Sequence, residues 1–249
     1  AGGDRHGRRL RGALVGAQVA LCMVLMIAAG LLVRGLHTTY TIDPRFEYRN
    51  VALISLESAF DGYTEEEAEA RRRRLVADLQ ALPGVEAVAS SDHKPLGDDM
   101  SPTAIRLPGE TERQRRIGEM TAVSEDYFFA LGLPIVRGRA FTAEEVRNPG
   151  PAPAAPDGAR PGRTRPAILS ETTARNLWPG SDPIGRMLLA MPPDGALPEG
   201  TLQVVGVVAD AQLSSLGHID SYFVYVPGDG LAHDERVHVV GAFVRVHRL

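Results

Sequence analysis

Four consecutive polar residues, Ser90-Ser91-Asp92-His93, contain the side-chain types of a nucleophilic triad. Triad members normally meet in space from separate segments, so adjacency in the sequence favours a polar strand end and turn instead. His233 and His238 enclose Asp234 and Glu235. Their five-residue spacing matches no standard metal-ligand pattern, and the nearby glycines indicate a loop. Both segments are therefore weak candidates for catalysis or metal binding.

The motifs that bind nucleotides or build hydrolytic sites are missing from the sequence. Lys94 is the single lysine and Pro95 follows it, so the chain has no GK[ST] element to hold phosphates. GxGxxG, HExxH, an EF-hand loop, paired CxxC and the GxSxG nucleophile elbow are also absent. The sequence predicts no enzyme activity, no cofactor and no metal.

Charge is distributed unevenly along the chain. From Tyr40 onward there are 22 basic and 30 acidic residues. An acidic module without a basic stripe is a poor nucleic-acid binder. The single cysteine, Cys22, lies in the most apolar stretch and cannot form an internal disulfide.

Leu14 to Val33 is an uncharged apolar run with one strongly polar residue, Gln18. At 1.5 Å per residue it spans about 30 Å, the thickness of a bilayer's hydrocarbon core. The alternative is a cleaved signal peptide, but the run exceeds the roughly 7–15 apolar residues of a signal. We therefore expect a transmembrane helix over residues 14–36.

Arginines set the expected orientation of this helix. Arg5, Arg8, Arg9 and Arg11 cluster before it, whereas the arginines after it are spread out. The positive-inside rule then places residues 1–13 in the cytoplasm and the rest of the chain outside.

Small residues recur at helical spacing in the same segment. Gly12, Gly16 and Ala20 follow one another every four residues, which would let another helix approach closely, and Gln18 could add a hydrogen bond. The alternative, which stays open, is that small residues are simply common in membrane helices.

The remaining sequence alternates strand and helix signals. We expect a helix from Thr64 with a capping box to Glu67, a buried stripe of Ala68, Leu75, Leu79 and Leu82, and an end at Pro83-Gly84. Further helices are expected at 124–131 and 171–177. Strands are expected at 51–56, 85–90, 104–107, 119–123, 133–136, 167–169, 186–189, 203–208 and 237–246. Residues 148–166 are rich in proline and glycine, which predicts a loop inserted in one fold.

Three blocks of this sequence resemble the MacB/FtsX-like ABC transporter permeases with a MacB-type periplasmic core domain. They are RRLRGALVGAQVALCMVLMIAAGLLVRGL (8–36), VSEDYFFALGLPIVRGRAFT (123–142), and ILSETTARNLWPGSDPIGRML (168–188) followed by VVGVVADAQLSSLG (204–217). Their order and spacing also agree with the family. Eight residues in these blocks are expected to maintain the fold: Tyr127, Phe128, Gly132, Gly138, Arg139, Trp178, Pro179 and Gly185.

The resemblance implies an α+β fold, with one N-terminal transmembrane helix and a mixed β-α-β periplasmic domain of two subdomains over residues 40–249. It implies the bacterial inner membrane, with the main domain in the periplasm. The family's three further membrane helices are absent from this sequence, which starts without methionine and stops within an expected strand. We therefore expect a fragment of a longer permease. The start of the chain resembles the beginning of the second half of a duplicated permease.

In function, the resemblance implies a non-catalytic permease segment that couples ATP-driven transmembrane motion to export or to action on an envelope protein. The expected partners are the permease's other membrane helices, a cytoplasmic ABC ATPase, and a periplasmic substrate or partner protein. One alternative is a single-span, membrane-anchored periplasmic domain that binds or senses a ligand or acts as a scaffold. Another is an anchored hydrolase, which would need a convergent polar cleft.

Overall fold

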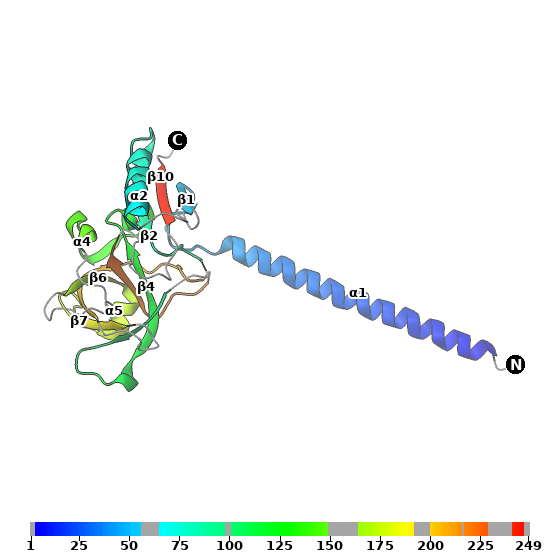
Figure 1. Cartoon of the computed structure of the whole chain (residues 1–249). Coiled ribbons are helices and arrows are strands. Elements are labelled where there is room, and N and C mark those ends of the chain that lie inside the picture. Colours follow the sequence, from blue (N-terminus) through cyan, green and yellow to red (C-terminus); the bar gives the residue numbers. More distant parts are fainter. Residues whose placement is uncertain are drawn as a thin grey trace. The chain divides into compact units, whose positions relative to one another are not determined.

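The chain divides into two compact units, Ala1–Asp43 and Pro44–Leu249. The computed structural model describes residues 3–55, 65–97, 101–148, 164–191, 200–215, 217–228 and 241–246. The first unit is a single uninterrupted helix, α1 (Gly3–Thr41), of 39 residues (Figure 1). At 1.5 Å per residue α1 is about 58 Å long.

The second unit is built on one large sheet with short helices between its strands (Figure 1). Its helices are α2 (Glu65–Gln80), the 3-10 turn η1 (Glu112–Gln114), α3 (Tyr127–Ala130), α4 (Ala143–Arg147) and α5 (Glu171–Leu177). Its strands are β1 (Val51–Ser55), β2 (Val85–Ser91), β3 (Ser101–Arg106), β4 (Arg116–Val123), β5 (Ile135–Gly138), β6 (Arg165–Ser170), β7 (Met187–Met191), β8 (Gly200–Val208), β9 (Phe223–Pro227) and β10 (Gly241–Val246).

Six strands close into a ring in the order β4-β3-β7-β8-β6-β9, because β9 pairs in parallel with β4. β6 and β8 are also parallel, and the other neighbours in the ring are antiparallel. One buried apolar cluster draws residues from all six strands, so it must fill the interior of the ring. It contains Ile105, Ala122, Ala167, Leu169, Leu188, Ala190, Leu202, Val204, Val207, Val224 and Val226, together with Ala174, Leu177 and Trp178 of α5 and its end.

Three further strands form an antiparallel extension in the order β1-β10-β2, and the tenth strand, β5, pairs antiparallel with β8. The extension joins the ring where Ser91 of β2 pairs with Val123 of β4. A second apolar cluster includes residues of this extension, α3 and the outer face of the ring. Alternation along β9 explains the division, because Val224 and Val226 belong to the first cluster whereas Phe223 and Tyr225 belong to the second.

Most of the predicted elements are present, with shifted ends. The helix predicted at 171–177 is α5, with the same bounds, and Ser170 Oγ accepts a hydrogen bond from the Thr173 N–H as its cap. The strand predicted at 85–90 is β2, one residue longer. The predicted loop 148–166 is too long at its C-terminal end, since β6 begins at Arg165; residues 149–163 lie outside the described part.

Two helix predictions need correction. Leu82 does not belong to a buried stripe, because α2 ends at Gln80 and Leu82 lies in the following turn, 51% exposed. Leu75 and Leu79, predicted to be buried, are only half-buried, whereas Thr64 and the side chain of Ala68 lie outside the described part. The helix predicted at 124–131 shortens to α3, because Ser124 Oγ accepts a hydrogen bond from Ser90 N–H instead of capping the helix.

The strand β9 was not predicted. All five of its residues are buried, so both of its faces carry apolar side chains and no alternation marks it in the sequence. The short helix α4 was missed as well. Its signal was present in Thr142 and Glu145, which form a capping box.

Candidate functional site

The most extensive exposed apolar surface among the described residues belongs to α1. Residues Arg11–Thr38 are long and apolar enough to cross a membrane, and none of that stretch is buried in protein. Every described side chain from 11 to 38 is exposed, including Met26 at 73% and Leu32 at 74%. An apolar surface of this size needs lipid or another apolar helix to cover it.

The predicted packing residues lie on two different faces of α1. Gly12, Gly16 and Ala20 follow one another at steps of about 40° around the axis, so they share a face. An added Cβ at Gly12 or Gly16 would meet nothing within 4 Å, so the helix leaves open space there. Gln18 lies about 200° from Gly16, because residues two apart point to different sides of a helix. One neighbouring helix therefore cannot contact both Gly16 and Gln18.

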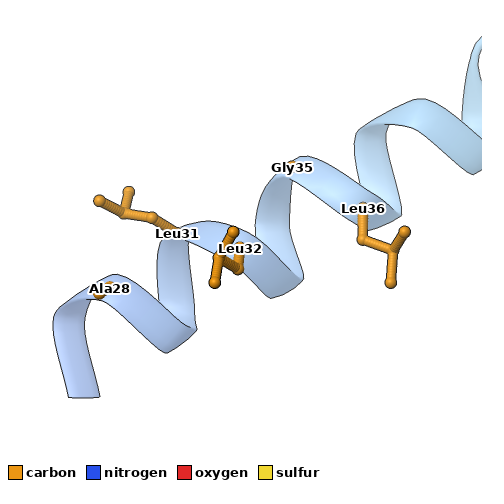
Figure 2. Close-up of a pocket in the computed structure, with 5 residues that line it drawn as sticks. All are labelled: Ala28, Leu31, Leu32, Gly35 and Leu36. Atoms are coloured by element: carbon orange, nitrogen blue, oxygen red, sulfur yellow. The ribbon is translucent and has the colours of Figure 1, made fainter. Parts of the chain in front are cut away.

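A third feature of α1 was not predicted. Ala28 and Gly35 lie seven residues apart, and the side chains of Leu31, Leu32 and Leu36 project beside them (Figure 2). These five residues line a shallow apolar hollow. The signal in the sequence was a pair of small residues seven positions apart with leucines beside them. Seven residues make about two helical turns, so both small residues lie on one side of α1, where the side chains of another helix can fit.

In the sheet domain, Tyr127 and Phe128 lie at the centre of the aromatic packing. They are 1% and 2% exposed. The rings of Phe128 and Tyr225 are 5.1 Å apart, and those of Tyr127 and Phe243 are 5.6 Å apart, both edge to face. Burial raises the pKa of the Tyr127 hydroxyl well above its usual range. Through these contacts α3 joins the ring strand β9 to the extension strand β10.

The predicted motif glycines differ in how tightly they are enclosed. Gly138 has φ +69°, and a Cβ there would lie 2.2 Å from the Val205 carbonyl oxygen. Gly185 has φ +80° but open space around it. Its N–H donates to the Val204 carbonyl oxygen at 2.8 Å. Both residues use the left-handed backbone that glycine adopts without strain. Only at Gly138 would a side chain also clash with neighbouring atoms.

Arg139 holds α4 in place. Its two terminal nitrogens donate to the two carboxylate oxygens of Glu145, each at 2.7 Å. Glu145 also accepts from the Thr142 N–H in the capping box. The Arg139 guanidinium is the main reason that the pKa of Glu145 falls to about 2.

Trp178 and Pro179 follow α5 directly. Trp178 is 8% exposed and packs against the ring interior, with the Arg186 guanidinium 5.7 Å from its ring centroid. The turn after Pro179 leads to Gly185 and into β7, whose Leu188 is fully buried. Gly132, directly after α3, has φ +64°, and a Cβ there would lie 3.2 Å from Glu47 Cβ. Pro179 is exposed. Maintenance of the fold remains the prediction for the eight motif residues.

Ser90-Ser91-Asp92-His93 is buried, but its geometry is not that of a nucleophilic triad. Ser91 Oγ donates to the His93 carbonyl oxygen at 2.5 Å instead of to its ring. Asp92 Oδ1 lies 2.8 Å from His93 Nδ1, and it accepts hydrogen bonds from Thr121 Oγ1 at 2.6 Å and Ala122 N–H at 2.8 Å. These contacts fix the end of β2 against β4, in keeping with the strand end and turn that the sequence favours.

Metal-binding candidates gain no support from the described part of the chain. No group of three or more His, Cys, Asp or Glu side chains there is arranged to hold an ion. His233 and His238 lie outside the described residues.

Comparison with known proteins assigns the family. The model of the MacB-like periplasmic core domain matches residues 17–247. The macrolide export ATP-binding/permease protein MacB of Mannheimia succiniciproducens is 23% identical over 172 residues, which are 67% of this chain and 21% of that protein. The chain thus spans about a fifth of the length of that relative.

Two solved structures are also similar. The extracellular domain of the noncanonic ABC-type transporter YknZ from Gram-positive bacteria is 18% identical, with a TM-score of 0.45 over 74% of this chain and 80% of that one. The periplasmic region of MacB from Actinobacillus actinomycetemcomitans is 14% identical, with a TM-score of 0.48 over 80% of this chain and 75% of that one. Because the family model matches nearly the whole chain, the chain belongs to the family of the MacB-like periplasmic core domain.

Proposed function

We propose that this chain is part of an ABC transporter permease, in which α1 crosses the inner membrane and the sheet domain works in the periplasm. The family match over residues 17–247 carries the proposal, because it includes most of the exposed apolar helix as well as the sheet domain. Residues 1–13 are then cytoplasmic, 14–36 span the membrane and 40–249 form the periplasmic domain.

The same proposal covers the mechanism. ATP is hydrolysed by a separate ABC ATPase in the cytoplasm, and other membrane helices of the permease pack on α1. The movement of the membrane helices that ATP hydrolysis drives is passed to the periplasmic domain, which acts on an exported substrate or an envelope protein. We also infer two subdomains. One is the six-stranded ring with its own interior cluster, and the other is the β1-β10-β2 extension with α2.

Orientation can be tested by labelling single cysteines in intact cells. On a Cys22→Ala background, Thr111→Cys places a thiol in an exposed turn of the sheet domain, and Gly7→Cys places one before the apolar segment. A membrane-impermeant maleimide should label Thr111→Cys and label Gly7→Cys only after the cells are lysed. Labelling of Gly7→Cys in intact cells, without labelling of Thr111→Cys, would contradict the orientation.

The permease assignment can be tested by sequencing the gene on both sides of this segment. Three hydrophobic spans after residue 249 would support a permease. A stop codon directly after residue 249 would contradict it and favour a single-span binding, sensor or scaffold domain, whose ligand should raise its thermal stability.

A further inference from the structure

The chain enters the sheet domain and leaves its last described strand at one place, which we call the entry–exit corner (Glu47, Tyr48, Arg49, Phe129 and Arg245). Val51 of β1 pairs with Arg245 of β10. The Val246 N–H donates to the Asn50 carbonyl oxygen at 2.9 Å, and the Glu47 N–H donates to the Leu131 carbonyl oxygen at 2.7 Å. The segment before β1, the end of β10 and the end of α3 therefore meet.

Two aromatic rings at this corner are exposed. Phe129 is 56% exposed, although Tyr127 and Phe128 on the same helix are buried. Tyr48 is 54% exposed. Burial of a phenylalanine ring stabilises a fold, and the exposed ring of Phe129 forgoes much of that stabilisation. The protein core therefore does not account for Phe129.

Each exposed ring has an arginine beside it. The Arg245 guanidinium lies 4.9 Å from the Phe129 ring centroid, and its Nη1 donates to the Phe129 carbonyl oxygen at 2.6 Å. The Arg49 guanidinium lies 5.7 Å from the Tyr48 ring centroid. Glu86 accepts from Arg245 at 3.0 Å and Glu47 accepts from the Arg49 N–H, so the corner holds both signs of charge. Aromatic rings beside arginines suit the headgroup layer, where the ring enters the acyl boundary and the guanidinium binds phosphate.

The covalent chain limits how far this corner can be from the membrane. Tyr48 is seven residues after Thr41, the last residue of α1, so the two Cα atoms can be at most about 25 Å apart. The apolar stretch Arg11–Thr38 is about 42 Å long as a helix, longer than the roughly 30 Å hydrocarbon core. Its end and the linker that follows therefore reach the headgroup layer.

We propose that the entry–exit corner docks on the lipid headgroup layer, with Phe129 and Tyr48 as its aromatic anchors. This inference rests on the proposed function, because it requires that α1 crosses a membrane. In that arrangement, the corner sets the distance of the sheet domain from the bilayer at the point where the chain enters the domain.

Tryptophan fluorescence in vesicles tests the proposal with the whole chain. The single native tryptophan is replaced by Trp178→Phe, and Phe129→Trp or Tyr48→Trp then reports on the corner while keeping an aromatic ring there. Leu25→Trp reports on α1, and Ile117→Trp, at a 53% exposed site near the start of β4, is the matched control outside the corner. The chain is reconstituted into two sets of vesicles of phosphatidylethanolamine and phosphatidylglycerol. In one set the acyl chains are brominated near the headgroup, to quench the corner reporters and Ile117→Trp. In the other they are brominated near the bilayer centre, to quench Leu25→Trp at the middle of the span.

We expect strong quenching of Leu25→Trp, and quenching of Phe129→Trp and Tyr48→Trp that is several-fold greater than that of Ile117→Trp. If Leu25→Trp is quenched while both corner reporters behave like Ile117→Trp, the corner does not touch lipid and only this inference fails. Equal, strong quenching of Ile117→Trp and the corner also overturns it, because the contact would not be specific. Absence of quenching at Leu25→Trp would contradict the membrane span itself, and with it the proposed function.

Discussion

The two faces of the ring strands are packed in different ways. The inner face carries small and aliphatic residues such as Ala167, Leu169 and Val224, enclosed by six strands and α5. The outer face of β9 carries Phe223 and Tyr225, which pack on α3 and the β1-β10-β2 extension. A closed ring of six strands has a narrow interior, and the strand residues that fill it are alanine, valine, leucine and isoleucine, without aromatic rings. The outer face has no such limit, and large rings there connect separate elements.

Removing an aromatic ring from the outer cluster should have the largest effect. Phe128→Ala should lower the free energy of unfolding of the sheet domain by about 3–5 kcal/mol, because a buried ring is replaced by a cavity. Phe129→Ala, one residue along the same helix, removes an exposed ring and should cost less than about 1 kcal/mol. Urea unfolding of the detergent-solubilised chain measures both. Equal losses would show that the whole of α3, and not one of its faces, holds the two parts together.

The ring interior should come next. Leu202→Ala removes a fully buried side chain from β8 and should cost about 2–5 kcal/mol. The exposed Leu82→Ala, in the turn after α2, is the control and should cost less than about 0.5 kcal/mol. The same urea titration applies. A loss as small as that of the control would show that the ring collapses readily around the cavity, against the rigid interior that we infer.

Gly138 and Gly185 together measure how closely β5 lies against β8, its antiparallel partner. Gly138→Ala puts a Cβ against the Val205 carbonyl oxygen in a left-handed backbone, so the loss should reach about 2 kcal/mol or more. Gly185→Ala has the same kind of backbone without the clash and should cost about 1 kcal/mol. Thermal unfolding of the two variants in the same detergent gives the comparison. A smaller loss of stability for Gly138→Ala than for Gly185→Ala would mean that β5 can shift away from β8 to make room for the added Cβ.

How much of this could be predicted from the sequence depends on which face a residue occupies. The apolar helix, β2 and α5 were predictable because each is marked by residues that are neighbours in the sequence, namely an uncharged apolar run, a short apolar strand and the residues of a helix start. β9 was not, because it is buried on both faces through ring closure with β4 and β6, which lie far from it in the chain. Alternation disappears in such a strand, and its run of five residues resembles any short apolar segment.

The candidate site shows the same limit. The resemblance singled out Tyr127 and Phe128, and the structure places both in the aromatic cluster. Phe129 stands beside them in the sequence with nothing to mark it as exposed, and its arginine, Arg245, is 116 residues away. On α1, spacing alone put Gln18 with Gly16, although helix geometry sets them on opposite sides. Contacts between distant segments, unlike caps and periodicity, leave no local pattern.

The smallest predicted effect concerns Arg139 and Glu145, the ion pair that holds α4 beside the ring. The pKa of Glu145 is lowered to about 2, first by its hydrogen bonds to Arg139, so the folded state favours the charged carboxylate. The contribution of this pair to stability is therefore fully present above the ordinary carboxyl pKa and is lost as the pH falls from about 4.5 towards 2. Because Arg139 is half exposed, screening limits the pair to about 0.5–1 kcal/mol.

Glu145→Gln should accordingly lower the free energy of unfolding by that amount at neutral pH and leave it nearly unchanged near pH 2. Urea titrations of both proteins between pH 2 and pH 7 would measure this difference. Glu144→Gln, which changes an exposed neighbour on the same helix, is the control and should show a smaller dependence on pH. A Glu145→Gln loss that persists undiminished near pH 2 would mean that the side chain acts through packing or the capping box, and that α4 is held to the ring without the ion pair.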